Sequence, residues 1–212
     1  MNRNLASAFL LVFISVCYQS CAQAQDAKQS PTLPPPAKIL SNNIPVYDEF
    51  AKLEPLFQQE SDTTYVINFW ATWCKPCVKE LPYFENLHRS VGKEKMKVIL
   101  VSLDFRNQLE SKLKPFIRDN NYSAEVILLL DNKYNSWIDK VDKSWSGSIP
   151  STLLIKGGKR LFAETEFEND QELRDFVYSF INSHYTLNYE NFISVTSDFC
   201  NIYSGFRTKY RI

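Results

Sequence analysis

The sequence predicts an α/β fold in which a central mixed β-sheet is flanked by helices on both faces. Apolar runs rich in β-branched and aromatic residues alternate with helical patterns, which is typical of parallel strands joined by crossover helices. Near the end of this pattern, Gly157-Gly158 separates two further strand-like runs, as in a β-hairpin. A hairpin adds antiparallel strands, so the sheet is expected to be mixed.

The elements follow from hydrophobic periodicity. Before the hairpin we expect a helical pattern at 47–57, strands at 64–70, 97–103 and 126–130, and helices at 74–89, 109–120 and 133–141. Pro115 predicts a kink or break in its helix. The hairpin strands lie at 152–155 and 160–165, and Asp170 is expected to cap a closing helix that ends near Ser183.

Composition indicates one globular domain with extensions. The chain has 212 residues, of which 44% are hydrophobic, and this is ample for a single core. Its 24 basic and 24 acidic residues cancel and are interspersed. Without a basic patch or an acidic tail, nucleic acid is not an expected partner.

The first 24 residues have the three parts of a secretory signal peptide. Arg3 supplies a positive charge, an apolar run extends from Leu5 to Tyr18, and Ala22-Gln23-Ala24 offers a cleavage site. We therefore expect export to the periplasm or cell envelope. Cleavage would remove Cys17 and Cys21 and leave three cysteines in the mature chain, which are Cys74, Cys77 and Cys200.

Two alternatives for the amino terminus stay open, a lipid on Cys21 and a retained membrane anchor. Residues 25–43 contain Pro34-Pro35-Pro36 and are expected to form a linker. The domain is expected to span 44–184. Residues 185–212 are unassigned, and we favour a packed extension over a partner-binding tail, with Cys200 as a buried spare thiol.

A C-x-x-C pair at the start of a helical pattern carries the chemistry. Cysteines three positions apart on a first helical turn can form a disulfide, and the helix amino terminus favours a thiolate at the first. Cys74 is the expected nucleophile and Cys77 the resolving thiol. Pro76 suits the first turn and limits the sulfur geometry, and Lys75 has a small tuning effect by its charge.

Three other interpretations compete with dithiol redox chemistry. A zinc site would need Cys200, His88 or His184 as further ligands, and these form no second short-spaced pair, so no metal and no cofactor are expected. A binding module with a purely structural disulfide is the alternative from a different class. Thiol peroxidase is weaker, because Ala71-Thr72-Trp73-Cys74 does not match the T-x-x-C arrangement around a peroxidatic cysteine.

Trp73-Cys74-Lys75-Pro76-Cys77, after the run Val66 to Trp70, resembles the thioredoxin superfamily. Val78-Lys79-Glu80-Leu81-Pro82 resembles its secreted TlpA/ResA-type thiol-disulfide oxidoreductases. The resemblance covers roughly 44–184 and implies a thioredoxin-like fold. It also implies that Pro82 kinks the active-site helix. Ser148-Ile149-Pro150-Ser151-Thr152 matches the segment in which a cis-proline lies beside the C-x-x-C and pairs with the substrate backbone.

One departure from thioredoxin concerns the proton carrier. Asn68 stands where thioredoxins have a buried aspartate, and Glu80 matches the acidic residue that TlpA/ResA-type proteins use instead. A carboxyl group near a buried thiol would have a raised pKa and exchange a proton with Cys77. The alternative is a solvated glutamate that pairs with a nearby lysine.

The resemblance further implies a reductase of protein disulfides. Its partners would be cysteine-containing proteins, among them apocytochromes c before haem attachment, and a membrane thiol electron donor. Trp73, Ile149 and Pro150 are the expected substrate-binding residues. Trp70 is expected either to shield the disulfide or to pack in the core.

Overall fold

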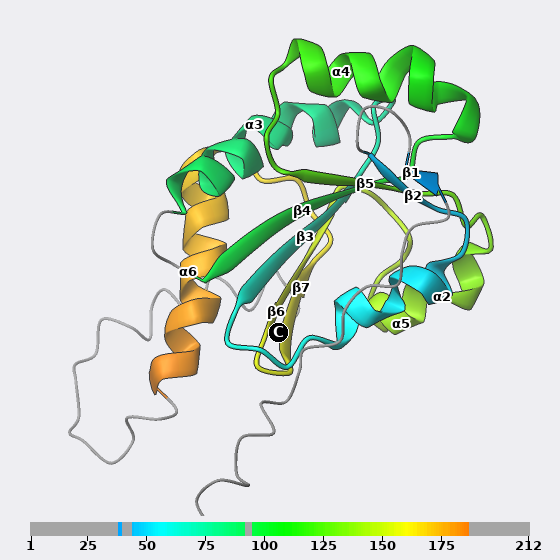
Figure 1. The fold of residues 1–212 in the computed structure, drawn as a ribbon. Helices are drawn as coiled ribbons and strands as arrows, with labels where there is room; N and C mark the ends of the chain where they lie inside the picture. The colour runs from blue at the N-terminus through cyan, green and yellow to red at the C-terminus, as the bar shows by residue number, and fades with distance from the viewer. Residues whose placement is uncertain (1–37, 40–43, 92–94, 187–212) are drawn as a thin grey trace, which may run out of the picture. The chain divides into compact units, whose positions relative to one another are not determined.

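The computed structural model describes residues 38–39, 44–91 and 95–186 (Figure 1). The expected signal peptide at 1–24 therefore lies outside the described residues. So do most of the linker at 25–43 and nearly all of the extension at 185–212, with Cys17, Cys21 and Cys200.

A seven-stranded sheet forms the centre of the domain, in the order β1-β2-β5-β4-β3-β6-β7. The strands are β1 (Lys38–Ile39), β2 (Pro45–Tyr47), β3 (Thr64–Trp70), β4 (Met96–Ser102), β5 (Glu125–Leu129), β6 (Ser151–Lys156) and β7 (Lys159–Ala163). Strands β2, β5, β4 and β3 are parallel, whereas β1, β6 and β7 run antiparallel to their neighbours. The predicted mixed sheet is thus confirmed.

Helices cover both faces of this sheet (Figure 1). They are α2 (Phe50–Leu53), α3 (Lys75–Ser90), α4 (Lys114–Asp119), α5 (Ile138–Val141) and α6 (Asp170–Thr186). Helices α3, α4 and α6 lie on one face, and α2 and α5 lie on the other. Short 3-10 turns lie at Glu54–Gln58, Arg106–Gln108 and Tyr134–Ser136.

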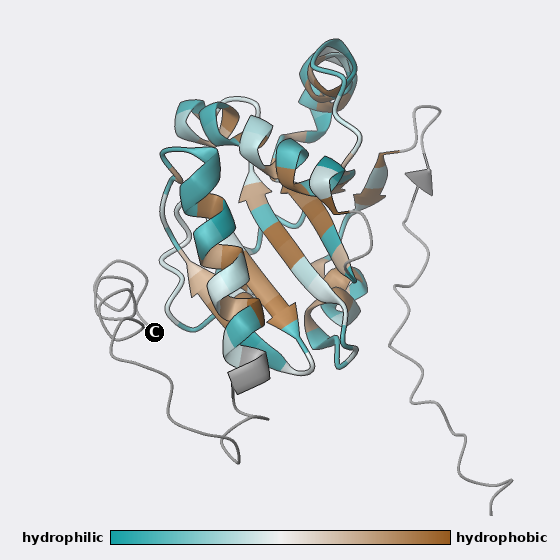
Figure 2. Cartoon of the chain, turned by 90° about the vertical axis from the view of Figure 1, so that its left-hand side faces the viewer, coloured by the Kyte–Doolittle hydropathy of each residue, from teal (hydrophilic) through white to brown (hydrophobic). Residues whose placement is uncertain are grey.

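The core has two layers, one on each side of the sheet. Val66 and Trp70 of β3 face the layer under α3 and α6, while Ile67 and Phe69 face the layer under α2 and α5. Figure 2 shows the strands coloured mainly as hydrophobic, whereas the helices carry both kinds of residue. Each large apolar side chain that is fully buried contributes about 1.5–3 kcal/mol to the free energy of unfolding. This burial explains why the apolar runs predicted the strands.

The structure corrects four details of the predicted elements. The helical pattern at 47–57 is preceded by a strand, β2, and strand β1 lies inside the expected linker. The expected helix at 109–120 is interrupted, because Leu109–Leu113 form a wider π-type turn before α4. Pro115 lies in the first turn of α4, directly after this π-type turn. Asn169, not Asp170, caps α6, since its Oδ1 accepts from Glu172 N–H at 3.0 Å.

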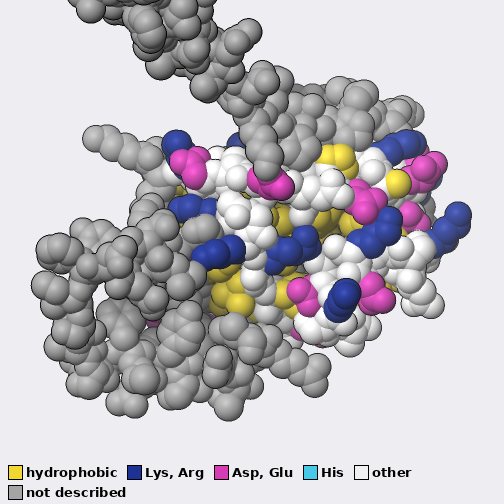
Figure 3. All heavy atoms as spheres, turned by 90° about the horizontal axis from the view of Figure 1, so that it is seen from below, with side chains coloured by type: hydrophobic (Ala, Val, Ile, Leu, Met, Phe, Trp, Pro, Cys, Tyr) yellow, Lys and Arg dark blue, Asp and Glu magenta, His cyan; other side chains and the backbone are white. Residues whose placement is uncertain are grey.

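Charged side chains are mixed on the described surface. In the view from below, lysine and arginine side chains lie among aspartate and glutamate side chains, with apolar patches between them (Figure 3). The interspersed charges of the sequence therefore remain interspersed on that face.

Candidate redox site at the start of helix α3

Cys74 and Cys77 form a disulfide where β3 passes into α3. Their Cα atoms are 5.3 Å apart. Cys74 is the N-cap of α3, and its Sγ accepts a hydrogen bond from Cys77 N–H at 3.3 Å. Pro76 lies in the first turn, where a backbone donor is not required. The helix amino terminus therefore directs an N–H group at the first sulfur and favours negative charge there.

The two sulfurs differ in access. The residue Cys74 is 7% exposed, whereas Cys77 is fully buried. Lys75 and Pro76 between them are exposed. A partner sulfur approaching from solvent therefore reaches Cys74 and not Cys77.

The Ile149–Pro150 segment lies against this disulfide. Its peptide bond is cis, as the resemblance implied, and the Ile149 carbonyl oxygen is 3.8 Å from Cys74 Sγ. The loop before it is fixed by Glu164, whose carboxylate accepts from the backbone N–H groups of Ser146 and Ser148 at 3.1 and 3.0 Å. The backbone next to the reactive sulfur is thus held in place.

Glu80 is fully buried on α3, three residues beyond Cys77. Its Oε1 accepts from Asn68 Nδ2 at 2.9 Å, and its Oε2 accepts from Phe167 N–H at 2.8 Å. Burial raises the pKa of Glu80 from 4.5 to about 8, although these two hydrogen bonds oppose the increase. The carboxyl group therefore keeps a proton near neutral pH.

This arrangement excludes the solvated glutamate as an interpretation of Glu80. The neighbouring lysine, Lys79, pairs with Glu166 at 2.6 Å instead. Asn68, in the middle of β3, holds the carboxyl group and also donates to Thr152 Oγ1 at 3.1 Å. Asn68 thus links Glu80 to the strand that follows Pro150.

The two tryptophans near the disulfide have different environments. Trp70 is fully buried and packs against Phe116, with ring centroids 5.6 Å apart, so it belongs to the core. Trp73 is 48% exposed and stacks on Phe105 at 6.3 Å, with the rings 19° from parallel. An exposed pair of aromatic rings therefore lies directly beside Cys74.

Asp104 is a site residue that the sequence analysis missed. It is buried at the end of β4, and its carboxylate accepts from Thr72 Oγ1 at 2.6 Å, from Thr72 N–H at 3.1 Å and from Ser102 Oγ at 2.8 Å. An acidic residue directly after a buried strand, beside the C-x-x-C, was the available indication. Asp104 fixes the loop that carries Trp73 and Cys74.

The described residues contain neither a candidate metal-binding cluster nor a candidate membrane-spanning helix. Histidine, cysteine, aspartate and glutamate side chains do not gather there in groups of three or more suited to a metal ion. Nor does a helix in the described ranges have the length and apolar character needed to cross a membrane.

A thioredoxin-like fold with a C-x-x-C disulfide at the start of its first long helix, next to a cis-proline, defines a thioredoxin-fold protein of the dithiol class. Residues 52–161, more than half of the 212-residue chain, match the AhpC/TSA family, and the chain belongs to that family.

Curated relatives point to the same class. The chain is 34% identical over 98 residues to thiol-disulfide oxidoreductase ResA of Bacillus cereus, which is 44% of this chain and 49% of that protein. It is 30% identical over 63 residues to sporulation thiol-disulfide oxidoreductase A of Bacillus subtilis, which is 30% of this chain and 38% of that protein. The chain thus spans about half or less of the length of these relatives.

Among solved structures, the thioredoxin-related protein from Neisseria meningitidis serogroup B aligns with a TM-score of 0.48 at 23% identity. The alignment covers 60% of this chain and 90% of that chain.

Proposed function

We propose that this chain is a thiol-disulfide oxidoreductase that reduces disulfides in partner proteins. The observation that carries this proposal is the unequal access of the two sulfurs, since Cys74 is 7% exposed and Cys77 is fully buried. A structural disulfide needs no such difference. A dithiol that reacts in a fixed order requires one accessible nucleophile and one protected resolving thiol.

The reaction proceeds in two exchanges. The Cys74 thiolate attacks one sulfur of the partner's disulfide, so a mixed disulfide forms and the other partner sulfur leaves as a thiolate. Cys77, as a thiolate, then attacks Cys74 Sγ, which closes the protein disulfide and releases the second partner thiol. Two electrons pass from the dithiol to the partner, whose two sulfurs each take up a proton.

Glu80 is proposed to exchange the proton of Cys77. Both residues are fully buried and lie three positions apart on α3. With its pKa raised to about 8, the carboxyl group binds and releases a proton close to the pH at which a thiol ionises. Proton exchange inside the core avoids bringing water to the buried sulfur.

The expected setting is the periplasm or cell envelope. The signal-like residues 1–24 support export, and Cys21 leaves lipid attachment as a variant of the same location. In an oxidising compartment the dithiol needs a donor, for which a membrane thiol protein is proposed. Apocytochromes c are the proposed substrates by resemblance to the TlpA/ResA type.

The redox potential of the Cys74–Cys77 couple tests the direction of transfer. Equilibration of the mature protein with dithiothreitol or glutathione buffers, followed by thiol labelling, measures it. A value at or below about −250 mV supports a reductase, whereas a value near about −120 mV contradicts that direction and indicates a disulfide donor.

Single cysteine variants test the activity itself. Cys77→Ser is expected to accumulate mixed disulfides with partners through Cys74, and Cys74→Ser is expected to lose turnover. Cys200→Ser is the matched control, because it removes a thiol and leaves the pair intact. A binding module with a structural disulfide would instead keep its partner in both variants and trap none.

A further inference from the structure

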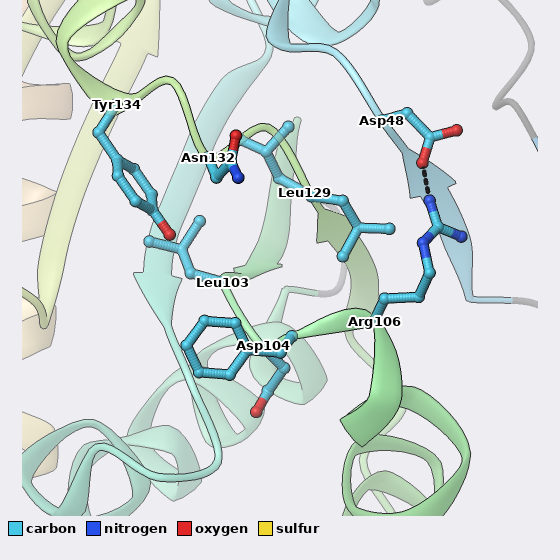
Figure 4. A pocket seen from close by; sticks show the side chains of 9 residues that line it. Asp48, Leu103, Asp104, Arg106, Leu129, Asn132 and Tyr134 are labelled. Atoms are coloured by element: carbon cyan, nitrogen blue, oxygen red, sulfur yellow. Dashed lines mark hydrogen bonds and ion pairs between the residues drawn. The ribbon is translucent and has the colours of Figure 1, made fainter.

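A cleft lies beside the redox site at the same edge of the sheet. Its volume is about 390 Å³, and it opens where β2, β4 and β5 end (Figure 4). It is lined by leucines from the strand ends, by two aromatic residues and by an ion pair at its rim, namely Leu103, Leu129, Phe105, Tyr134, Asp48 and Arg106.

Exposed aromatic side chains connect the cleft to the reactive sulfur. Among the residues whose burial is described, the large hydrophobic side chains that stand exposed are Trp73 at 48%, Phe105 at 58% and Tyr134 at 41%. Trp73 adjoins Cys74 and stacks on Phe105, which with Tyr134 lines the cleft. Exposed apolar groups that gather in this way mark an interaction site.

The walls of the cleft are held in place by the fold. Phe105 N–H donates to Gln108 Oε1 at 3.2 Å, and Gln108 N–H donates to the Phe105 carbonyl at 2.8 Å. Next to the lining residue Asn132, Asp131, which does not itself line the cleft, accepts from the backbone N–H groups of Phe50 and Lys133, each at 3.0 Å. A fixed cleft loses little conformational entropy when a ligand enters.

The strand order places the cleft on a line with the reacting groups. The Ile149–Pro150 segment leads directly into β6 on one side of β3, and the cleft lies on the other side, at the ends of β4 and β5. With strands about 4.8 Å apart, the cleft is about 7 Å from β3 along the sheet edge. In an extended polypeptide, side chains two residues apart on one face are separated by about 6.6 Å.

We infer that this cleft binds an aromatic side chain of the protein substrate, two residues from the substrate's reacting cysteine. The inference rests on the proposed function and adds a sequence preference to it. The rings of Phe105 and Tyr134 with the leucines offer aromatic packing. Asn132 and the Asp48–Arg106 pair, in the same lining, offer hydrogen-bond partners to a phenol or an indole.

Synthetic peptides test this preference in a single turnover. Each substrate is a dimer of one short peptide, joined by a disulfide between its two cysteines. One peptide has tyrosine two residues from the cysteine and the other has alanine at that position. Both peptides are made in two versions, with this residue either before or after the cysteine. The pre-reduced protein transfers two electrons to the dimer and releases two peptide thiols, while its own dithiol becomes the disulfide. Acid quenching and chromatography of the peptide thiol give a second-order rate constant for each peptide.

The tyrosine peptide is expected to react about ten-fold faster than the alanine peptide, for one of the two placements. Tyr134→Ala should bring this ratio close to one, and Lys133→Ala, an exposed neighbour outside the cleft lining, should leave it unchanged. Because each ratio is taken within one protein sample, it does not depend on the folded fraction.

Two results would overturn these ideas separately. Equal rates for tyrosine and alanine peptides in both placements contradict the role of the cleft and leave the proposed oxidoreductase standing. A pre-reduced protein that releases no peptide thiol from any dimer contradicts the proposed function itself.

Discussion

Replacing Glu80 by glutamine should remove a pH dependence of stability that this one side chain imposes. Burial raises the pKa of Glu80 from 4.5 to about 8, so the folded protein binds its proton more tightly than the unfolded chain does. Stability from this group is therefore fully present below pH 4.5 and is lost as the pH rises to about 8. At about 1.4 kcal/mol for each pKa unit, the loss between pH 5 and pH 9 is about 4 kcal/mol.

Glu80→Gln does not titrate, so its stability lacks this pH dependence, but the substitution is destabilising for another reason. The amide has one acceptor oxygen where the carboxyl group has two, so either Phe167 N–H loses its acceptor or Asn68 Nδ2 loses one of its acceptors. That loss destabilises the variant by about 1–3 kcal/mol at every pH. The difference in unfolding free energy between the variant and the wild type should therefore shift in favour of the variant by about 4 kcal/mol from pH 5 to pH 9.

Urea unfolding of the oxidised proteins at several pH values measures this difference. Glu85→Gln is a matched control on the same helix. Burial alone raises the pKa of Glu85, but hydrogen bonds from Ser123, Arg89 and Ala124 hold it below its ordinary value. The stabilisation that the Glu85 carboxylate contributes is then complete above about pH 5. The unfolding free energy lost in Glu85→Gln should therefore be the same from pH 5 to pH 9. Parallel stability curves for Glu80→Gln and the wild type would refute the reasoning.

Further predictions concern Asp104, the two tryptophans near the disulfide, and two glycines with positive φ. Asp104→Ala should lower the unfolding free energy by about 2–4 kcal/mol, because it leaves buried donors unsatisfied, and urea unfolding against a substitution at an exposed aspartate checks it. Trp70→Ala should cost about 3–5 kcal/mol in the same assay. Trp73→Ala should cost less than about 1 kcal/mol but slow the reduction of peptide disulfides, and equal stability losses for the two tryptophans would contradict their assignment. Gly147→Ala should destabilise by about 1–3 kcal/mol, since φ is 95° and the new Cβ would meet Ile138 Cδ1 at 3.2 Å. Gly158 has a φ of 76° but no atom near the position of a new Cβ, so Gly158→Ala should destabilise less than Gly147→Ala. A larger loss of unfolding free energy at Gly158 would contradict a role for the contact with Ile138.

The elements that the sequence predicted best are those buried along their whole length. Strand β3 has its expected bounds, because all seven residues of Thr64–Trp70 are buried and apolar character dominates. Strand β2 was missed, since Pro45–Tyr47 has three residues and is stabilised by pairing with β5, far along the chain. Short strands of this kind carry too little local pattern to be distinguished from a helix.

In the candidate site, too, the residues close together in the sequence were predicted, whereas Asp104 and Phe105, which the fold brings there, were missed. The C-x-x-C spacing predicted the pairing of Cys74 with Cys77, whereas Glu80, one turn further along the same helix, was predicted through the resemblance to TlpA/ResA-type proteins. Asp104 accepts a hydrogen bond from Thr72, which is 32 residues away, so its position after a strand did not identify its partner. Phe105 likewise meets Trp73 only because β3 and β4 are neighbours in the sheet.

The limited access to the disulfide has a kinetic consequence. In the proposed reaction, with Cys77 fully buried and only Cys74 reachable, the electron donor and the substrate protein would have to use the same sulfur atom. The two partners therefore exclude one another and take turns, so steady-state turnover should follow a ping-pong rate law. An excess of substrate disulfide would then leave the Cys74–Cys77 pair oxidised and an excess of donor would leave it reduced, so the relative abundance of the two partners would set the redox state of the pair.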